Sequence, residues 1–266
     1  MPVVQREDGA RIAWEADGPE TAPPLLLIMG LAYPAAMWFR LVPALADRYR
    51  VIRVDNRGAG LTGDVPGAPY TVETMAGDCL AVLDAAGVQQ AHVVGISMGG
   101  LIAQEIALTA PERVRSLCLT ATHPGIAHAV VDPEAMAMLM KRGEMTPAEA
   151  AEASVPFNYA PSTPRERIEE DWAVRFPLAA TNEGYMAQAV GTAQWDGYDR
   201  IPGITAPTLV LHGEIDRLVP PANGEAIAER IPGAELVLVP DANHVLMTDQ
   251  PEQVGKVLLD WLDRNP

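Results

Sequence analysis

The fold of this 266-residue chain is decided by one stretch, His92-Val93-Val94-Gly95-Ile96-Ser97-Met98-Gly99-Gly100. A short apolar run leads into its Gly-Ile-Ser-Met-Gly segment, and apolar residues at helical spacing begin directly after it. A strand, a G-x-S-x-G turn and a helix are typical of a nucleophile elbow, a strained turn that exposes a serine hydroxyl. A tight turn with an incidental serine is the plainer alternative, but the chain has only four serines, so a chance match is not expected. We therefore predict that Ser97 is a catalytic nucleophile.

Six short apolar runs predict a sheet. They are residues 25–29, 51–55, 92–96, 117–120, 208–211 and 235–239. Each run is too short and too continuous for an amphipathic helix, so each predicts a buried parallel strand. Helical patterns separate the runs at residues 71–86, 98–110, 221–231 and 251–262, and residues 3–15 predict a hairpin at one edge. The alternation indicates an α/β fold, with a mostly parallel sheet flanked by helices.

The alternation stops between residues 123 and 201, where no strand is predicted. Thr146 and Thr163 each stand before a proline and have a glutamate three residues further on, which predicts two capped helix starts. We expect this stretch to be a helical cap insertion over the functional site. The predicted organisation is therefore a core domain of residues 1–122 and 202–266, interrupted by a helical cap of residues 123–201.

A serine nucleophile needs a base, and the base needs an orienting acid. In folds with this elbow the chain order is serine, acid, histidine. Of the five histidines, His244 lies just past the last predicted strand, at the carboxyl end of the sheet where functional groups gather. The acid should follow the preceding strand, where both Glu214 and Asp216 are available; Asp241 is close to His244 but belongs to the same loop.

These patterns together resemble the α/β-hydrolase superfamily over nearly the whole chain. The matching segments are Asp55–Gly60, Gly95–Gly100, His212–Pro220 and His244. Within the superfamily the chain is similar to the small esterase, enol-lactonase and cofactor-free perhydrolase group. The resemblance implies that Asp216, rather than Glu214, is the acid, and that Ser97, Asp216 and His244 form a catalytic triad.

The resemblance also implies an oxyanion hole made by the backbone amides of Leu31 and Met98. Relatives usually have His-Gly where this chain has Met29-Gly30. Gly30 still permits the turn and Leu31 still offers its N–H, but the role of the usual histidine in holding this loop is lost.

Apolar residues around the expected site predict an uncharged substrate. The candidates for lining an acyl or alcohol pocket are Met29, Met140, Trp172 and Met186. The cations of the cap stand among acids, so we expect them to form solvent-facing ion pairs; they are Lys141, Arg142, Arg165, Arg167 and Arg175. A substrate carboxylate buried without a partner would be strongly disfavoured, and neutral short-to-medium esters are therefore expected to be preferred.

Composition narrows the functional classes further. With 19 basic and 35 acidic residues, the net charge of −16 argues against nucleic acid and anionic membranes as partners. Cys79 and Cys118 are expected to be buried small hydrophobic residues, and no signal peptide or membrane-length apolar run is visible, so a cytoplasmic location is expected. No metal-ligand spacing is present, and residues 58–63, which match a dinucleotide fingerprint, precede a predicted loop at 64–69 instead of a helix. No cofactor is expected.

The combined prediction is a serine hydrolase that cleaves carboxylic esters of small, mainly uncharged molecules through an acyl-enzyme. A lactonase or a cofactor-free perhydrolase would use the same triad and remain alternatives. A slow-turnover ligand receptor that keeps the triad is an alternative of another class, and a single covalent event instead of steady turnover would indicate it.

Overall fold

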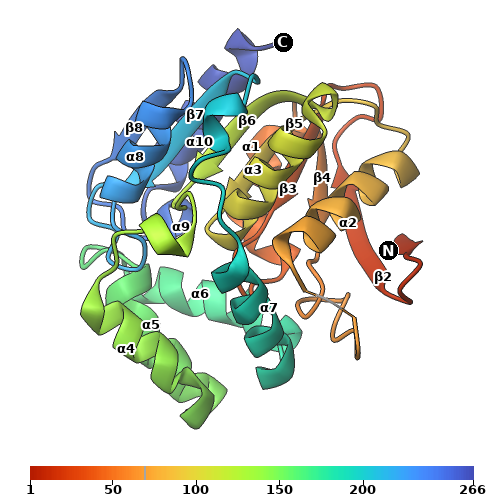
Figure 1. The fold of residues 1–266 in the computed structure, drawn as a ribbon. Coiled ribbons are helices and arrows are strands. Elements are labelled where there is room, and N and C mark those ends of the chain that lie inside the picture. The colour runs from red at the N-terminus through yellow and green to blue at the C-terminus, as the bar shows by residue number, and fades with distance from the viewer. Residues whose placement is uncertain (69) are drawn as a thin grey trace.

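A computed structural model describes residues 1–68 and 70–266, and its centre is an eight-stranded sheet in the order β1-β2-β4-β3-β5-β6-β7-β8 (Figure 1). The strands are β1 (Val3–Gln5), β2 (Arg11–Asp17), β3 (Pro24–Ile28), β4 (Arg50–Val54), β5 (Ala91–Ile96), β6 (Val114–Thr120), β7 (Thr208–Gly213) and β8 (Glu235–Val239). Only the pairs β1–β2 and β2–β4 are antiparallel, and the pairs from β4 to β8 are parallel. The predicted mostly parallel sheet with a hairpin at one edge is confirmed.

Helices cover both faces of this sheet (Figure 1). They are α1 (Val42–Ala46), α2 (Val72–Ala85), α3 (Met98–Thr109), α8 (Ala222–Arg230), α9 (Leu246–Asp249) and α10 (Pro251–Arg264). Alternate residues of a strand point to opposite faces of the sheet, so β3 contributes side chains to two hydrophobic cores, one on each face. Leu26 and Ile28 pack in the core that contains α2, α3 and α8, whereas Leu25 and Leu27 pack in the core that contains α1, α9 and α10.

The last strand differs from its prediction. Residues 235–239 do form a parallel strand, but Leu236 and Leu238 are each 36% exposed. The reason is position: β8 is the outer strand of the sheet and pairs with β7 alone. An apolar run predicts a strand but does not say which strand lies at the edge.

Four helices lie between β6 and β7, and they group at one end of the sheet (Figure 1). They are α4 (Pro133–Lys141), α5 (Pro147–Asn158), α6 (Arg165–Arg175) and α7 (Asn182–Gln194). We call this segment the insertion. The capping box of Thr146 is present at the start of α5. The cap predicted for Thr163 is wrong, because α6 begins at Arg165 without a side-chain cap and the Thr163 hydroxyl donates to Asp249, 2.5 Å away.

The segment that imitates a dinucleotide site is a turn. The backbone N–H of Gly58 donates to the carbonyl of Gly63 at 2.7 Å, and the next helix, α2, begins only at Val72. The loop predicted at 64–69 includes Pro69, which lies outside the described residues.

Candidate active site

Ser97 occupies a strained turn between β5 and α3. Its φ of 55° and ψ of −121° lie in a region that residues with a side chain seldom adopt. The flanking glycines are required here, because a Cβ on Gly95 would overlap the carbonyl oxygen of Gly99, and a Cβ on Gly99 would overlap that of Ile28. The local geometry is therefore that of the predicted elbow, with the serine presented at the carboxyl end of β5.

Asp216 is buried in the loop after β7 and contacts His244. Its Oδ2 lies 2.9 Å from Nδ1 of His244, and its Oδ1 accepts the backbone N–H of Val219 at 2.8 Å. Burial alone would raise the pKa of the Asp216 carboxyl, but His244 and His212 outweigh burial and hold this pKa below its ordinary value. An ionised Asp216 accepts a hydrogen bond from the Nδ1–H group of His244, which leaves Nε2 of His244 as the basic ring nitrogen.

The two rival acids lie elsewhere. The Glu214 side chain is exposed, and Oδ2 of Asp241 accepts the hydroxyl of Ser162 at 2.6 Å. Asp216 is thus the acid that the fold brings to His244.

Asn243 fixes the loop that carries His244. Its side-chain oxygen accepts the backbone N–H groups of His244 and Arg217, both at 3.0 Å, and its amide nitrogen donates to the carbonyl of Tyr159 at 3.0 Å. This residue ties the His244 loop to the loop of Asp216 and to the insertion. The sequence offered no signal for it, because its partners are set by tertiary structure.

A cavity of about 690 Å³ brings the predicted residues together. Ser97 and His244 line it, as do the two residues expected to supply the oxyanion hole, Leu31 and Met98. Met98 is the first residue of α3, so its N–H has no partner within the helix. The cavity is therefore a chamber in which a serine, an imidazole and a free backbone amide meet.

Three of the four predicted pocket residues also line this cavity, namely Met29, Met140 and Met186. Met140 is 79% exposed and Met186 is 52% exposed, so these two lie where the cavity meets solvent. Trp172 is not among the lining residues: its ring stacks on Phe176 with centroids 5.9 Å apart and lies under the guanidinium of Arg165.

The loop after β3 is held without the usual histidine. Asn56 donates its side-chain amide to the carbonyl of Met29 at 3.0 Å, and Oδ1 of Asp55 accepts the N–H of Ala35 at 2.6 Å. Gln188, from α7 of the insertion, accepts the N–H of Ala32 at 2.7 Å. These three side chains hold the loop in this chain, and none of them was foreseen as a holder of this loop.

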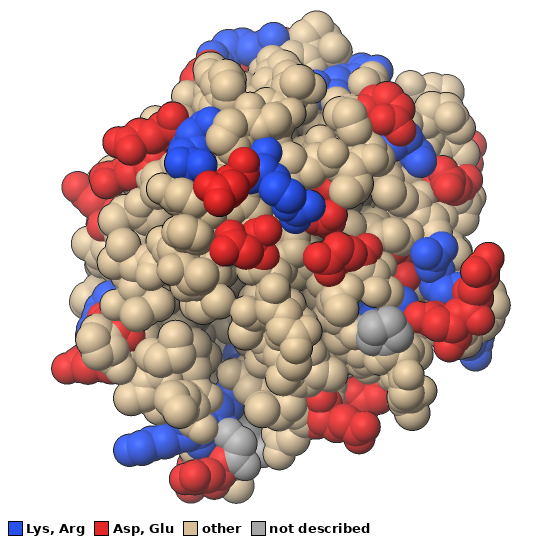
Figure 2. Space-filling model, in the orientation of Figure 1, with Lys and Arg blue, Asp and Glu red and all other residues tan. Residues whose placement is uncertain are grey.

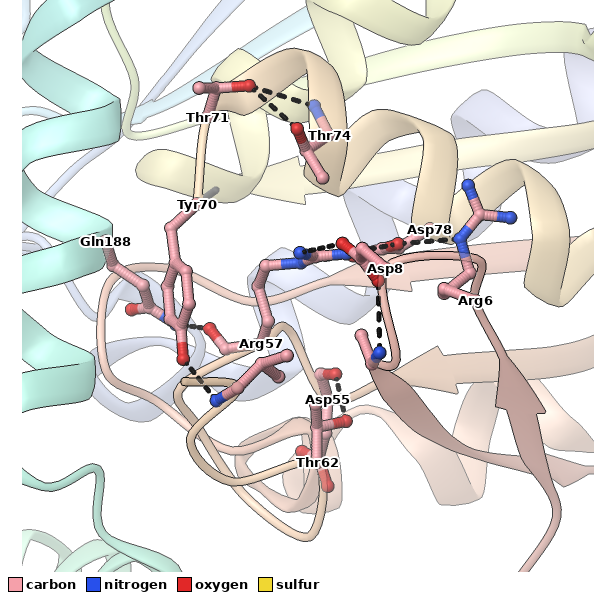
Figure 3. Close-up of polar contacts among 12 residues, drawn as sticks. Arg6, Asp8, Asp55, Arg57, Thr62, Tyr70, Thr71, Thr74, Asp78 and Gln188 are labelled. Carbon is pink, nitrogen blue, oxygen red and sulfur yellow. Dashed lines mark hydrogen bonds and ion pairs between the residues drawn. The ribbon is translucent and has the colours of Figure 1, made fainter. Parts of the chain in front are cut away.

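Gln188 also contacts the loop that carries Asp55 and Asn56. Its amide nitrogen donates to the carbonyl of Arg57 at 2.8 Å, and Figure 3 shows the two residues side by side. The Arg57 side chain is fully buried and reaches Asp78 and Asp8, each at 2.8 Å. The Asp55–Gly60 segment thus has a supporting role. Its residue Arg57 is anchored by ion pairs with Asp78 and Asp8, and its residues Asp55 and Asn56 contact the loop that carries Leu31.

One prediction about the cap cations is wrong. Arg165 does form the expected solvent-facing pairs, with Glu152 and Glu169. Arg142, however, lines the cavity, and Arg175 is only 7% exposed and donates to the hydroxyl of Tyr33 at 3.0 Å. For Arg142 and Arg175, the acids that lie nearby in the sequence did not become partners in space.

Four further features of the described residues bear on the predictions: metal-binding groups, membrane-spanning helices, surface charge and the cysteines. No group of three or more His, Cys, Asp or Glu side chains that could hold a metal ion occurs among them. Within residues 1–68 and 70–266, no helix is long and apolar enough to cross a membrane. On the face shown in Figure 2, Lys and Arg side chains are interspersed with Asp and Glu. Cys79 and Cys118 are free and buried, as predicted.

The fold belongs to one known class. Residues 23–251 match the family described as the alpha/beta hydrolase fold, and the chain is a member of that family. It is 34% identical to a putative carbamate hydrolase of Azorhizobium caulinodans, with 98% of each chain covered.

Solved structures are similar over the full length. A thermophilic esterase from Thermogutta terrifontis, solved with malate bound, shares 32% identity and a TM-score of 0.85, with 99% of each chain covered. The enol-lactonase from Burkholderia xenovorans shares 27% identity and a TM-score of 0.87, with 98% of this chain and all of that chain covered. The family and the names of these relatives support hydrolase activity.

Proposed function

We propose that this protein is a serine hydrolase of carboxylic esters that uses Ser97, His244 and Asp216 as a triad. One observation carries the proposal: Nδ1 of His244 lies 2.9 Å from Asp216, while His244 shares the cavity with Ser97 at its strained turn. A base oriented by a buried carboxylate, beside a serine hydroxyl that lines the same cavity, is the arrangement that activates a serine.

The reaction follows from these roles. His244 removes the Ser97 proton as Oγ attacks the ester carbonyl, and the carbonyl oxygen becomes an anion facing the amides of Leu31 and Met98. His244 then gives the proton to the departing alcohol, which leaves an acyl-enzyme. Water loses a proton to His244, attacks the acyl group and releases the acid, and the proton returns to Ser97.

A lactonase is the second candidate. Ring opening of a lactone uses the same attack, and the similarity to the Burkholderia xenovorans enol-lactonase favours including it. The carbamate hydrolase relative adds carbamates to the bonds worth testing.

The test is a panel of methyl esters, lactones and carbamates assayed with wild-type protein and with Ser97→Ala. Ser97→Ala should abolish turnover while the protein stays folded, because only a hydroxyl is lost. Ser162→Ala, at an exposed serine, is the matched control and should keep full activity.

An organophosphonate should label wild-type protein at Ser97. Labelling at another serine, or turnover that survives Ser97→Ala, would overturn the proposal. A burst of one equivalent without further turnover on every substrate would indicate the ligand-receptor alternative.

A further inference from the structure

The cavity contains a positive charge and no negative charge. Of the described residues that line it, Arg142 is the only Asp, Glu, Lys or Arg, although the chain has 35 acids and only 19 bases. The Arg142 guanidinium lies 4.2 Å from the ring centroid of Tyr185, another lining residue. In the part of the chain that the structure describes, no carboxylate forms an ion pair with it.

The environment of Arg142 disfavours its own charge. Burial lowers the pKa of the Arg142 guanidinium, and the nearby positive charge of Arg175 lowers it further. A guanidinium nevertheless keeps its proton. The cavity therefore contains a cation that nothing in the described protein neutralises.

A second cation, Arg175, packs against the lining residue Tyr33 on the side away from the cavity. Arg175 donates to the hydroxyl of Tyr33 at 3.0 Å, and its guanidinium lies 4.0 Å from the centroid of the same ring. Asp171, one turn earlier on α6, is engaged by Arg40 at 2.9 Å and does not neutralise Arg175. Two guanidinium groups of like charge thus lie near each other: Arg142 lines the cavity, and Arg175 lies next to the lining residue Tyr33.

The hydrogen bond from Arg175 makes the Tyr33 hydroxyl a hydrogen-bond donor at the cavity. Its hydroxyl oxygen accepts hydrogen bonds from Arg175 and from the side-chain amide of Asn158, the latter at 3.3 Å. With both lone pairs occupied, the hydroxyl can act only as a donor. Among the described residues no acceptor takes its proton, and Tyr33 lines the cavity.

On the basis of the hydrolase function proposed above, we propose that the substrate is an ester or lactone carrying a free carboxylate, which Arg142 and the Tyr33 hydroxyl bind. A carboxylate matches the fork of donors on a guanidinium and can accept the phenolic proton as well. The apolar remainder of the cavity suits an aliphatic segment between the carboxylate and the scissile bond. This inference replaces the neutral substrate that the sequence predicts, because that prediction rested on solvent-facing cap cations.

The test compares matched substrates that differ by one charge. The probes are the monomethyl and dimethyl esters of linear dicarboxylic acids of four to eight carbons, assayed as kcat/KM. Wild-type protein should prefer a half-ester of intermediate length over its dimethyl ester. Arg142→Gln should reduce the ratio of half-ester to dimethyl ester by about 10- to 100-fold, as expected for loss of a charged hydrogen bond.

Two further variants sharpen the result. Arg142→Lys keeps the charge but not the fork of donors, so it should give an intermediate ratio. Arg165→Gln removes an exposed, already paired cation of the insertion and should leave the ratio unchanged. Circular dichroism checks that each variant is folded.

Binding to Ser97→Ala separates this inference from the hydrolase proposal. Calorimetry with a linear dicarboxylate should show binding that Arg142→Gln, made in the same background, removes. If esters are hydrolysed but the charge preference is absent or does not depend on Arg142, the carboxylate site is wrong and the hydrolase function stands. If the dicarboxylate binds through Arg142 but no ester or lactone is turned over, the carboxylate site stands and the hydrolase function fails. Tighter Arg142-dependent binding of an alkyl phosphate than of the dicarboxylate would overturn the choice of a carboxylate.

Discussion

Gln188 offers a direct way to test how the loop after β3 is held, the loop that carries the proposed oxyanion donor Leu31. Gln188→Met keeps the length of the side chain but removes two hydrogen bonds, to the N–H of Ala32 at 2.7 Å and to the carbonyl of Arg57 at 2.8 Å. Gln188 is fully buried, so water cannot replace the lost partners. Each unpartnered backbone group costs about 1–3 kcal/mol, which gives roughly 2–6 kcal/mol for the pair.

The protein can reduce that cost by moving the loop. Ala32 has a φ of 62°, an unfavourable value for a residue with a side chain, and the Gln188 bond holds it there. If the loop relaxes, the adjacent amide of Leu31 moves away from the developing oxyanion. Loss of one such donor lowers turnover by roughly 10²–10³. We therefore expect kcat to fall at least about 10-fold while KM changes less, because the donor acts mainly in the transition state.

The assay measures kcat and KM on a neutral methyl ester, together with urea unfolding. Phosphonate titration counts the folded, reactive sites, so that kcat is expressed per site. Gln194→Met makes the same substitution at an exposed position of the same helix and should be neutral. A folded Gln188→Met protein with wild-type kcat per site would refute the idea that Gln188 positions this loop.

Two other predictions follow from the site and its surroundings. Asp216→Asn should lower turnover by up to ~10⁴ because it favours the wrong imidazole tautomer. Glu214→Gln, at an exposed residue, should lower turnover by less than about 10-fold. The measurement is kcat/KM of both variants on one ester, and a larger loss at Glu214 would mean that the acid is misassigned. Burial lowers the pKa of His92 to about 4, with Arg115 adding to the effect, so between pH 6.5 and 4 the unfolded chain binds a proton at this position that the folded chain does not. Stability should therefore fall as the pH drops through this window, by up to about 3 kcal/mol from His92. Urea unfolding at pH 7 and 4.5 should show a smaller loss in His92→Asn than in wild type, and equal losses would contradict the assignment.

The parts of the fold that the sequence predicts are those with local signals. The strand runs are found to within about three residues, since apolar continuity and the intervening helical spacing are written along the chain. The elbow at Ser97 is equally local, because the glycines that permit it are its immediate neighbours. Asp216 and His244 each follow a strand, so the parallel topology brings them to the same edge.

The missed features are contacts between distant segments. Gln188 and Ala32 form a hydrogen bond although they are 156 positions apart in the sequence, and no local sequence pattern near either residue predicts this bond. Arg142 has acids as sequence neighbours, yet its side chain enters the cavity and stacks on Tyr185. Local charge context predicts surface pairs well only where the side chain points to solvent, and the direction of a side chain in the insertion depends on how its helices pack.

The loop after β3, which carries the proposed oxyanion donor Leu31, lines the cavity and contacts the insertion. Its residue Ala32 is held by α7 through Gln188, and its residue Tyr33 is held by Asn158 at the end of α5 and by Arg175 at the end of α6. Three helices of the insertion therefore form hydrogen bonds with the loop that carries the amide of Leu31. Tyr185, on which Arg142 stacks, lies one turn before Gln188 on α7. An anion bound at Arg142 and Tyr33 would stabilise these same contacts, so a charged substrate should benefit in kcat as well as in KM, whereas a binding site independent of the loop would affect KM alone.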